Sequence, residues 1–355
     1  MVPIYQTSTY VQESPGKHKG YDYARSINPT RLAYERCIAD LENGQRGFAF
    51  ASGLAGMATV LELLDSGSHV IASDDLYGGT FRLFERVRSK SANLEFTFLD
   101  LSDPSALKKA IRTNTRMVWV ETPSNPLLKL IDLQAIGEFT HENKLIAVAD
   151  NTFASPWIQH PIDLGFDIVV HSATKYLNGH SDVVAGALAT ARDGQLWSRI
   201  RALRGQLGNA LGAFDAWLLM RGMRTLDIRV RSQAGTAATL AQRLVGHAAI
   251  AQVLYPGLAQ HAGHDTALRQ MSGGFGGMFS IRVKRGERAA IAVAASVNLW
   301  KRATSFGGIE SLIEHRASIE GDGSPCPGDL LRLSAGLEDV DELYLDLMQA
   351  LAAIS

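Results

Sequence analysis

The sequence predicts an α/β protein with a mainly parallel central sheet, followed by a smaller α+β domain. Short apolar runs alternate with helix-like segments through the first two thirds of the chain, which is the pattern of parallel strands covered by helices on both faces. From about Gly235 the pattern changes to a long helix, and then to strands at Gly277 to Val283 and Leu330 to Ala335. The length of 355 residues also suggests two domains. The predicted parallel strands include His69 to Ser73, Glu95 to Leu99, Met117 to Glu121 and Leu145 to Ala149.

The charge balance points away from nucleic acid and membrane surfaces, since 35 basic residues stand against 36 acidic ones. The longest apolar stretches, such as Gly186 to Thr190 and Ala289 to Ala295, are too short to cross a bilayer, and no signal peptide is visible. We therefore expect a cytoplasmic protein with no nucleic-acid or membrane partner. Cys37 and Cys326 lie far apart and form no metal-ligand cluster, so we expect neither a disulfide framework nor a metal site.

A carboxylate and a lysine follow two neighbouring apolar runs of the predicted sheet. Asp150 closes one run, and Lys175 follows the next run twenty-five residues later. Pyridoxal phosphate needs a lysine to hold it as a Schiff base and a carboxylate to keep its ring nitrogen protonated. Taken singly, the aspartate is explained as a helix cap and the lysine as a surface group. Together with the hydroxyls of Ser172 and Thr174, which suit a phosphate, the pair predicts a pyridoxal phosphate enzyme.

A run of small residues after another apolar stretch suits the phosphate. The segment Phe48 to Gly56 passes through Ser52 and Gly53 ahead of a helix-like stretch. At a helix start, free backbone N–H groups and the helix dipole favour an anion, and glycine permits close approach. An ordinary tight turn explains the small residues equally well. Tyr77 is a candidate to place its ring over the cofactor, although packing is the commoner role of an aromatic residue at a loop start.

Eight short segments along the chain carry a family resemblance. They are Pro3-Ile4-Tyr5-Gln6-Thr7-Ser8-Thr9, Tyr23-Ala24-Arg25, Asn28-Pro29-Thr30-Arg31, Tyr77-Gly78-Gly79-Thr80, Glu121-Thr122-Pro123-Ser124-Asn125-Pro126, His171-Ser172-Ala173-Thr174-Lys175-Tyr176, Gly179-His180-Ser181-Asp182 and Leu331-Arg332-Leu333-Ser334-Ala335-Gly336-Leu337-Glu338. In this order they resemble the Cys/Met metabolism family of pyridoxal phosphate enzymes, which includes cystathionine γ-synthase, cystathionine γ- and β-lyases, methionine γ-lyase and homoserine sulfhydrylases. Several segments in the family's order are far more specific than any one of them.

The resemblance implies an aspartate aminotransferase-like fold, fold type I, with pyridoxal 5'-phosphate as cofactor. It implies an N-terminal arm at residues 1–30 that contacts a neighbouring subunit, a large cofactor-binding α/β domain at 31–234 and a C-terminal α+β domain at 235–355. The chain opens almost directly on Pro3-Ile4-Tyr5, whereas the family usually has a longer arm. We therefore expect either a truncated or a naturally short N-terminus.

For the cofactor, the resemblance implies that Lys175 forms the covalent link and that Asp150 pairs with the ring nitrogen. Tyr77 is expected to stack on the ring. Tyr23 and Arg25 are similar to a pair that reaches the phosphate of a neighbouring subunit, which implies an active site shared between subunits of a homotetramer. The expected phosphate ligands within the subunit are Ser52, Gly53, Leu54, Ser172 and Thr174.

For the substrate, a sulfur amino acid, the resemblance implies that Arg332 grips the α-carboxylate, with help from Ser305 and Asn125. The planar fork of an arginine matches the geometry of a carboxylate. Lys175 is expected to move protons at Cα and, for a γ-leaving group, also at Cβ. The phenol of Tyr77 is the candidate proton donor to the departing group.

The reaction branch depends on residues that depart from the family's patterns. Thr304 stands where glutamate is typical of cystathionine γ-synthase and γ-lyase, tyrosine of bacterial β-lyase and valine of methionine γ-lyase. Gly79 stands where methionine γ-lyases commonly carry cysteine. The stretch from His315 to Gly321 lacks the usual Met-Thr-His, and its Arg316 and Glu320 either reach the far end of the substrate or are surface charges. We favour γ-elimination or γ-replacement on cystathionine or an activated homoserine. Cystathionine β-lyase, methionine γ-lyase and O-acyl-homoserine sulfhydrylase remain alternatives.

Two alternatives of other classes remain. A non-catalytic homologue that only binds the cofactor is disfavoured by the retention of Lys175, Asp150, Tyr77 and Arg332. A nucleotide-binding α/β enzyme is a weaker rival, because no Gly-x-Gly-x-x-Gly or Walker loop occurs between a strand and a helix.

Overall fold

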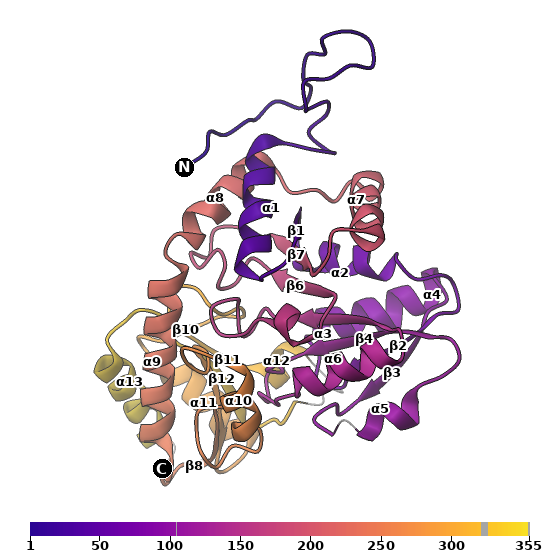
Figure 1. Ribbon diagram of the computed structural model, residues 1–355. Coiled ribbons are helices and arrows are strands. Elements are labelled where there is room, and N and C mark those ends of the chain that lie inside the picture. Colours follow the sequence, from indigo (N-terminus) through magenta and orange to yellow (C-terminus); the bar gives the residue numbers. More distant parts are fainter. Residues whose placement is uncertain (104, 321–325, 354–355) are drawn as a thin grey trace.

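Two β-sheets organise the protein, and the computed structural model describes them within residues 1–103, 105–320 and 326–353 (Figure 1). The larger sheet has seven strands in the order β1-β7-β6-β5-β4-β2-β3, and the second has five in the order β10-β11-β12-β9-β8. The strands of the larger sheet are β1 Arg46–Phe50, β2 His69–Ser73, β3 Glu95–Leu99, β4 Thr115–Glu121, β5 Ile146–Asp150, β6 Ile168–Ser172 and β7 Gly186–Thr190. Those of the second sheet are β8 Ile250–Leu254, β9 Met278–Val283, β10 Lys301–Arg302, β11 Leu312–His315 and β12 Leu330–Ser334.

The larger sheet is mainly parallel, which confirms the prediction. Strands β2 to β6 pair in parallel, whereas β7 runs antiparallel to both β6 and β1. Because β7 is reversed, β1 points the same way as the parallel strands. The carboxyl ends of these co-directional strands meet at one edge of the sheet, which is where open α/β sheets bind their ligands.

Helices cover both faces of the larger sheet because its strands are apolar on both sides. In β5, Val148 packs in a cluster with α2, whereas Ala147 and Ala149 pack with α6 on the opposite face. The α-helices are α1 Pro29–Leu41, α2 Gly53–Leu61, α3 Gly78–Arg82, α4 Ser89–Ser91, α5 Ser105–Ala110, α6 Leu133–Glu142, α7 Gln195–Leu207, α8 Ala213–Met223, α9 Leu226–Leu244, α10 His264–Gln270, α11 Glu287–Ser296, α12 Arg316–Glu320 and α13 Val340–Ala352. A π-helical segment, η1 Leu83–Arg88, follows α3, and a short 3₁₀ helix, η2 Pro161–Leu164, precedes β6.

The second sheet has one face under helices and the other toward the larger sheet. In β12, Leu331 and Leu333 pack in a cluster with α9, α11 and α13. Since side chains alternate along a strand, Arg332 lies on the opposite face. On that same side, the hydroxyl of Ser280 in β9 donates to the carbonyl of Pro126, which belongs to the larger sheet's loops, at 2.9 Å. The alternation of β12 therefore turns Arg332 toward the carboxyl edge of the larger sheet.

Helix α9 connects the two cores. Its first half, with Leu226 and Val230, packs in the core of the larger sheet, and its second half, with Leu240 and Leu244, packs in the core of the second sheet. The boundary expected after residue 234 falls inside this helix, and the division into domains stays a prediction.

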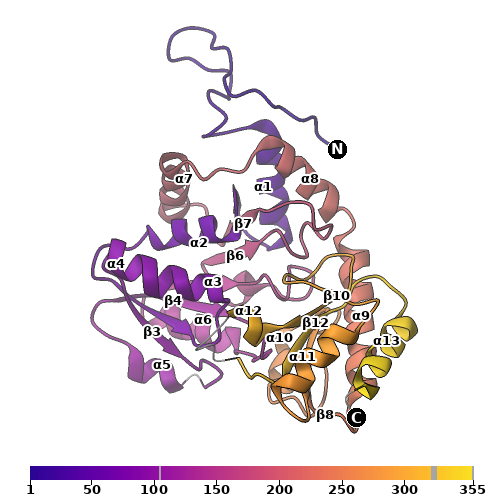
Figure 2. The same cartoon turned by 180° about the vertical axis from the view of Figure 1, so that it is seen from behind.

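An extended segment precedes α1 and projects from the body of the protein (Figure 1, Figure 2). Most of its residues are exposed, and it is anchored at its base, where the Asn28 amide donates to the Tyr5 carbonyl at 2.7 Å and the Thr30 hydroxyl donates to the Pro3 carbonyl at 2.8 Å. Its contact with a neighbouring subunit stays a prediction. Within the described residues, no helix is both long enough and apolar enough to cross a bilayer.

Candidate active site

The predicted site residues, apart from Tyr23 and Arg25, converge on a cavity of about 290 Å³ at the carboxyl edge of the larger sheet. We call the side built from loops after the parallel strands the cofactor wall, and the side built from β11, the start of α12, β12 and residues 304–306 the substrate wall. A larger hollow of about 830 Å³ lies near Lys129 and His261 and contains none of the predicted residues. The cofactor wall contributes Ser52, Gly53, Leu54, Met57, Tyr77, Glu121, Asn125, Asp150, Thr152, Phe153, Ser172, Thr174, Lys175 and Val184, and the substrate wall contributes Thr304, Ser305, Phe306, Arg316 and Arg332.

Lys175 reaches from the cofactor wall to the substrate wall. Its Nζ donates to the Ser305 hydroxyl at 2.9 Å. Burial, with the positive charges of Arg332 and Arg316, lowers the pKa of Lys175 to about 8, while Glu314 acts in the opposite direction. A lysine with such a pKa is partly neutral near physiological pH, so its amine can act as a nucleophile and as a base.

Asp150 lies at the end of β5 and is only 4 % exposed. Its Oδ1 accepts hydrogen bonds from both the backbone N–H and the hydroxyl of Thr152, and that hydroxyl accepts the backbone N–H of Ser172. Burial raises the pKa of Asp150, and the Thr152 hydrogen bonds oppose the rise. A protonated ring nitrogen beside the carboxylate would supply the opposite charge that stabilises its ionised form.

The start of α2 forms a cradle for an anion. Ser52 is the N-cap residue, and its hydroxyl accepts the backbone N–H of Ala55, which leaves the N–H groups of Gly53 and Leu54 in the first turn. Gly53 packs so closely on β6 that a Cβ atom there would lie 2.9 Å from the Cα of Ser172. This close approach brings the helix start next to the Ser172 hydroxyl, as a phosphate site requires.

Thr174 also lines the cavity, although its hydroxyl has local partners. It accepts the backbone N–H of Ala185 at 3.0 Å and lies 3.2 Å from the carbonyl of the same residue. The hydroxyl donates to that carbonyl and so stabilises the turn that presents Lys175, and donation to a phosphate oxygen would require its proton to turn away from Ala185.

Tyr77 follows β2 and caps the short helix α3. Its backbone N–H donates to Oε2 of Glu121, a buried residue at the end of β4, at 2.8 Å. Burial raises the pKa of Glu121 well above its usual range, and the neighbouring Asp150 acts in the same direction. Tyr77 is 39 % exposed and lines the cavity, so its ring is open to stacking by a ligand.

Arg332 is held by neutral groups from both walls. Its Nη1 donates to Oδ1 of Asn125 at 3.0 Å, and its Nη2 donates to the carbonyl of Ser305 at 2.8 Å. Ser305 adopts φ 97°, a conformation that is uncommon for a residue with a side chain, and it presents its carbonyl to Arg332 while its hydroxyl accepts from Lys175. Burial lowers the pKa of Arg332 to about 10, so the guanidinium stays charged at neutral pH.

A buried carboxylate links two arginines on the substrate wall. Glu314 of β11 is the direct partner of Arg332 in the antiparallel register, and it forms an ion pair with the Nη2 of that arginine. Its other oxygen lies 3.4 Å from Nη1 of Arg316. Both Glu314 and Arg316 are at least 95 % buried. The side chain of Glu320, the other candidate for the substrate's far end, lies outside the described part of the chain, as does Gly321.

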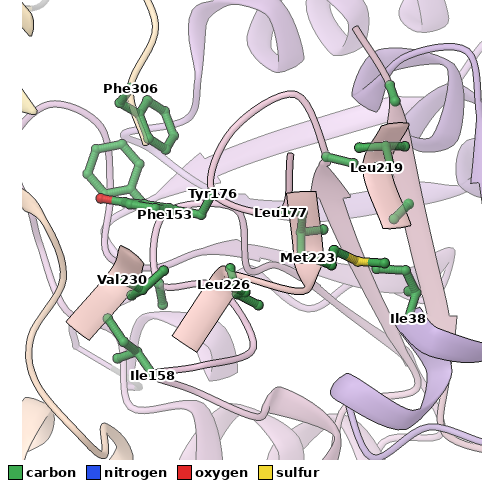
Figure 3. Packing of buried hydrophobic residues seen from close by; sticks show 14 of the residues in the cluster. Ile38, Phe153, Ile158, Tyr176, Leu177, Leu219, Met223, Leu226, Val230 and Phe306 are labelled. Carbon is green, nitrogen blue, oxygen red and sulfur yellow. The ribbon is translucent and has the colours of Figure 1, made fainter. Parts of the chain in front are cut away.

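Phe306, Phe153 and Tyr176 lie together in the buried cluster (Figure 3), and Phe306 and Phe153 also line the cavity as its aromatic floor. The Phe306 ring lies edge-on to Phe153, with centroids 4.6 Å apart, and 5.8 Å from Tyr176. The Nζ of Lys175 lies 5.3 Å from the centre of the Phe306 ring, and the Cζ of Arg332 lies 5.7 Å from it. The floor therefore holds both cations in a desolvated setting with favourable cation–π contacts.

Tyr23 and Arg25 do not join the cavity of their own subunit. Tyr23 is 43 % exposed on the N-terminal segment, and Arg25 stacks over its ring and donates to the carbonyl of Gly205 in α7 at 2.7 Å. Their role in a neighbouring subunit's site stays a prediction. All the other predicted site residues line the cavity.

Several residues of the site were not predicted. Thr152 lies two positions after Asp150, and Glu121 is the last residue of a predicted strand. Both could have been predicted from their position at or just after a strand end. Glu314 is followed directly by His315 and Arg316, so no local pattern marked it as a buried acid. Phe306 had no such signal, because an aromatic residue in a loop is usually explained by packing.

The cavity fits pyridoxal phosphate on three independent features. The lowered pKa of Lys175 suits a reaction with the aldehyde. Both Thr152 hydrogen bonds go to one oxygen of Asp150, so the other oxygen can accept a ring N–H. The start of α2, next to Ser172, suits the phosphate. These groups lie on one wall and face the arginine that suits a substrate carboxylate.

Comparisons with known proteins agree with this geometry. A family model described as Cys/Met metabolism PLP-dependent enzyme matches residues 1–352. The chain is 48 % identical to cystathionine beta-lyase of Coxiella burnetii over 99 % of its own length and 92 % of the relative's. It is 46 % identical to cystathionine gamma-synthase of Mycobacterium leprae over 99 % of its length and 91 % of the relative's.

Two solved structures share the fold. The chain superposes on metB from Corynebacterium glutamicum with a TM-score of 0.97 and 40 % identity, covering 100 % of this chain and 93 % of that one. It superposes on cystathionine gamma-lyase from Lactobacillus plantarum, complexed with L-serine, with a TM-score of 0.95 and 40 % identity, covering 99 % and 93 % of the two chains.

Proposed function

The chain belongs to the family of Cys/Met metabolism PLP-dependent enzymes, and on this premise we propose that it acts on cystathionine or an activated homoserine by γ-elimination or γ-replacement. It is a trans-sulfuration enzyme of sulfur amino-acid metabolism that uses pyridoxal 5'-phosphate. The observation that carries catalysis is the setting of Lys175, whose pKa is lowered to about 8 and whose Nζ lies 2.9 Å from the Ser305 hydroxyl, and the similarity to proteins named cystathionine gamma-synthase and gamma-lyase supports the γ assignment.

The cofactor, when bound, supplies an electron sink for the negative charge that develops at Cα of the substrate. Lys175 holds the cofactor before the substrate arrives and then moves the proton at Cα. Release of a γ-leaving group needs a second proton to leave Cβ, and a lysine whose pKa is near working pH can both accept and return protons. Asp150 holds the ring nitrogen in its protonated form.

The substrate wall binds and orients the amino acid. Arg332 takes the α-carboxylate, because its fork faces the cavity and is fixed by Asn125 and the Ser305 carbonyl. Phe306 and the walls around it exclude water from the reacting carbons. Tyr77 donates a proton to the departing group. Its position is fixed by the hydrogen bond from its backbone N–H to Glu121.

A β-elimination is the second candidate function. It is favoured by the 48 % identity to a protein named cystathionine beta-lyase, and it needs only the Cα proton transfer that Lys175 already performs. Lys175 can transfer the protons that either elimination requires, so the two reactions are distinguished by their products.

The experiment that tests the proposal follows thiol and keto-acid release from L-cystathionine, with O-succinyl-L-homoserine, O-acetyl-L-homoserine and L-methionine alongside, while the absorption spectrum is recorded. Release of 2-oxobutyrate with cysteine, or formation of cystathionine from an acylated homoserine and added L-cysteine with release of succinate or acetate, supports γ chemistry. Pyruvate with homocysteine moves the assignment to β-cleavage. A cofactor spectrum with no turnover of any compound contradicts the enzyme assignment and favours a cofactor-binding homologue.

We also propose a homotetramer in which Tyr23 and Arg25 complete the site of a neighbouring subunit. Two observations support this: both residues are exposed, and neither lines the cavity of its own subunit. Subunits carrying Lys175→Ala and Arg25→Ala are each expected to be poorly active alone. Mixed and refolded together, they should regain activity, because one hybrid site combines both native residues. No gain on mixing, with a monomer by light scattering, contradicts the shared site.

A further inference from the structure

Glu121 is a buried acid of the cavity, and the proposed function uses only one of its two oxygens. It is the last residue of β4, it is 4 % exposed, and it lines the cavity. Its Oε2 accepts the backbone N–H of Tyr77 at 2.8 Å, and no hydrogen bond from the described residues reaches its Oε1. Oε1 is not sealed in the interior, so it opens on the cavity. A carboxyl oxygen in such a setting needs a proton or a ligand.

The charged neighbours of Glu121 favour its protonated form. Asp150 is its direct partner in the parallel register of β4 and β5, and Asp75 follows β2 on the other side. Burial raises the pKa of Glu121 well above its usual range, and both neighbouring carboxylates act in the same direction. The Tyr77 N–H and Arg316 of α12 oppose the rise without cancelling it. Two buried carboxylates on adjacent strands repel each other when both are ionised, so one of them holds a proton.

The hydrogen bonds of the pair decide which acid holds the proton. Asp150 accepts two hydrogen bonds from Thr152, and His171 of β6 adds a favourable interaction with its charge. Glu121 accepts one hydrogen bond, from Tyr77. More donors stabilise the ionised form, so Asp150 is the carboxylate and Glu121 is the neutral acid. Because Oε2 of Glu121 is an acceptor, the proton lies on Oε1, which opens on the cavity.

The order of the strands indicates which part of the cofactor this proton meets. Ser172 on β6, Asp150 on β5 and Glu121 on β4 lie at the ends of three neighbouring parallel strands. Ser172 belongs to the phosphate cradle and Asp150 suits the ring nitrogen, so Glu121 lies beyond the ring nitrogen from the phosphate. In pyridoxal phosphate, that edge of the ring carries a methyl group and the phenolic oxygen, and only the oxygen accepts a hydrogen bond.

We propose that Glu121 binds the cofactor as a protonated acid, donating a hydrogen bond from Oε1 to the phenolic oxygen while Oε2 anchors Tyr77. The inference rests on the proposed function for the orientation of the cofactor, with Asp150 at the ring nitrogen. It holds equally for γ- and β-elimination. A donor at the phenolic oxygen stabilises the negative charge there and weakens its hold on the proton of the Lys175 nitrogen. The absorption band of the bound cofactor therefore titrates at a lower pH than it would without this donor.

The test is a pH titration of that absorption band in the cofactor-loaded enzyme, without substrate. Glu121→Gln keeps an acceptor for Tyr77 and a donor toward the cavity and removes only the ability to ionise, so the midpoint should be little changed. Glu121→Leu removes the donor at similar volume. Its midpoint should rise by about 1 to 2 pH units, and its cofactor affinity should fall by about 10- to 100-fold. Glu138→Gln removes an exposed carboxylate of α6 and should leave both values unchanged.

A midpoint that falls in Glu121→Gln overturns the proposal, because it shows that an ionised Glu121 had been raising the midpoint. An unchanged midpoint in Glu121→Leu also overturns it and gives the phenolic oxygen to another donor, such as the amide of Asn125. Lowered cofactor affinity alone would then reflect only the anchoring of Tyr77.

Infrared spectroscopy decides if Glu121→Leu fails to fold or to bind cofactor, or if the native band does not titrate. The difference between the loaded native enzyme and Glu121→Gln should contain the C=O stretch of a protonated carboxyl group from the native enzyme. A carboxylate band in its place overturns the proposal. An error in the reaction assignment would appear in the products formed from L-cystathionine and would leave these spectra unchanged.

Discussion

The two walls of the cavity solve different physical problems. The cofactor wall is built from the ends of parallel strands, and its contacts are largely hydrogen bonds such as those of Thr152 to Asp150 and Ser52 to α2. The substrate wall is built from an antiparallel pair, and its contacts centre on an ion cluster of Glu314, Arg316 and Arg332. We propose that the first wall holds the cofactor, which stays bound, and that the second binds the charged substrate, which is exchanged in each reaction cycle.

The two walls also differ in the charges that they bury. On the substrate wall, the buried carboxylate of Glu314 contacts both Arg332 and Arg316, and we propose that the Arg332 guanidinium binds an anionic substrate. On the cofactor wall, Asp150 is a buried acid whose pKa is raised by burial, and a cationic ring nitrogen beside it would lower that pKa. Changes on the two walls should therefore have separable effects.

The largest effect is expected from Lys175→Ala. Removing the group that holds the cofactor covalently and moves the Cα proton should lower kcat by at least about 10³-fold. The cofactor should still bind non-covalently through the α2 cradle, so its absorption band should become insensitive to borohydride. A variant that keeps near-native kcat would place the reaction on another lysine.

The next effect concerns pH and the cofactor-free protein. The pKa of Lys175 is lowered to about 8 in the folded state and is 10.5 in its ordinary state, so the unfolded chain binds more protons between these values. Native stability should therefore rise as pH increases from about 8 to about 10.5. Over this range the free energy of unfolding of the native chain should rise by about 3 kcal/mol. Lys175→Met, which has no titrating group at this position, should not show this rise.

Urea unfolding of both proteins checks this prediction. Lys175→Met should be the more stable protein below pH 8, and the gap should close toward pH 10.5. A gap of constant size across this range would show that burial does not destabilise the protonated lysine.

A smaller effect is expected on the substrate wall from Arg332→Lys. A lysine keeps the charge but cannot contact Asn125, the Ser305 carbonyl and a carboxylate together. KM should rise by roughly 10- to 100-fold, while the affinity for pyridoxal phosphate stays within about two-fold of native. A parallel loss of cofactor affinity would break the distinction between the two walls.

The smallest effect is expected from Gly53→Ala on the cofactor wall. The added Cβ would lie 2.9 Å from the Cα of Ser172, so the α2 start must shift away from β6. Cofactor affinity should fall by roughly 10-fold, as for the loss of a charged hydrogen bond, with KM for substrate little changed. Gly205→Ala in α7 is the matched control, because a Cβ there meets nothing within 4 Å. Equal effects of the two substitutions would contradict the cradle.

The same contrast governs what the sequence could predict. Strands β2 and β3 match their predicted bounds, and the site residues of the cofactor wall were predictable because Asp150, Ser172 and Tyr77 come at or just after strand ends. At the other wall, Arg332 was predicted through resemblance. The pairing of Glu314 with Arg332 was not, because it depends on the register of β11 on β12, which no local pattern specifies.

Long-range geometry also hid the role of Ser305. Its contacts to Lys175 and Arg332 depend on a positive φ, which the sequence does not predict for a serine. The antiparallel direction of β7 was likewise not predicted, since its run Gly186–Thr190 is as apolar as the parallel strands. An apolar run reports burial on both faces and says nothing of strand direction.

The most direct test of the division between the walls is to reduce the cofactor-loaded enzyme with borohydride and locate the pyridoxyl group by peptide mass spectrometry. The account predicts the group on Lys175 in the native protein and equally in Arg332→Lys, and its absence in Lys175→Ala. Labelling of a different lysine in the native protein, or loss of labelling in Arg332→Lys at saturating cofactor, would contradict it.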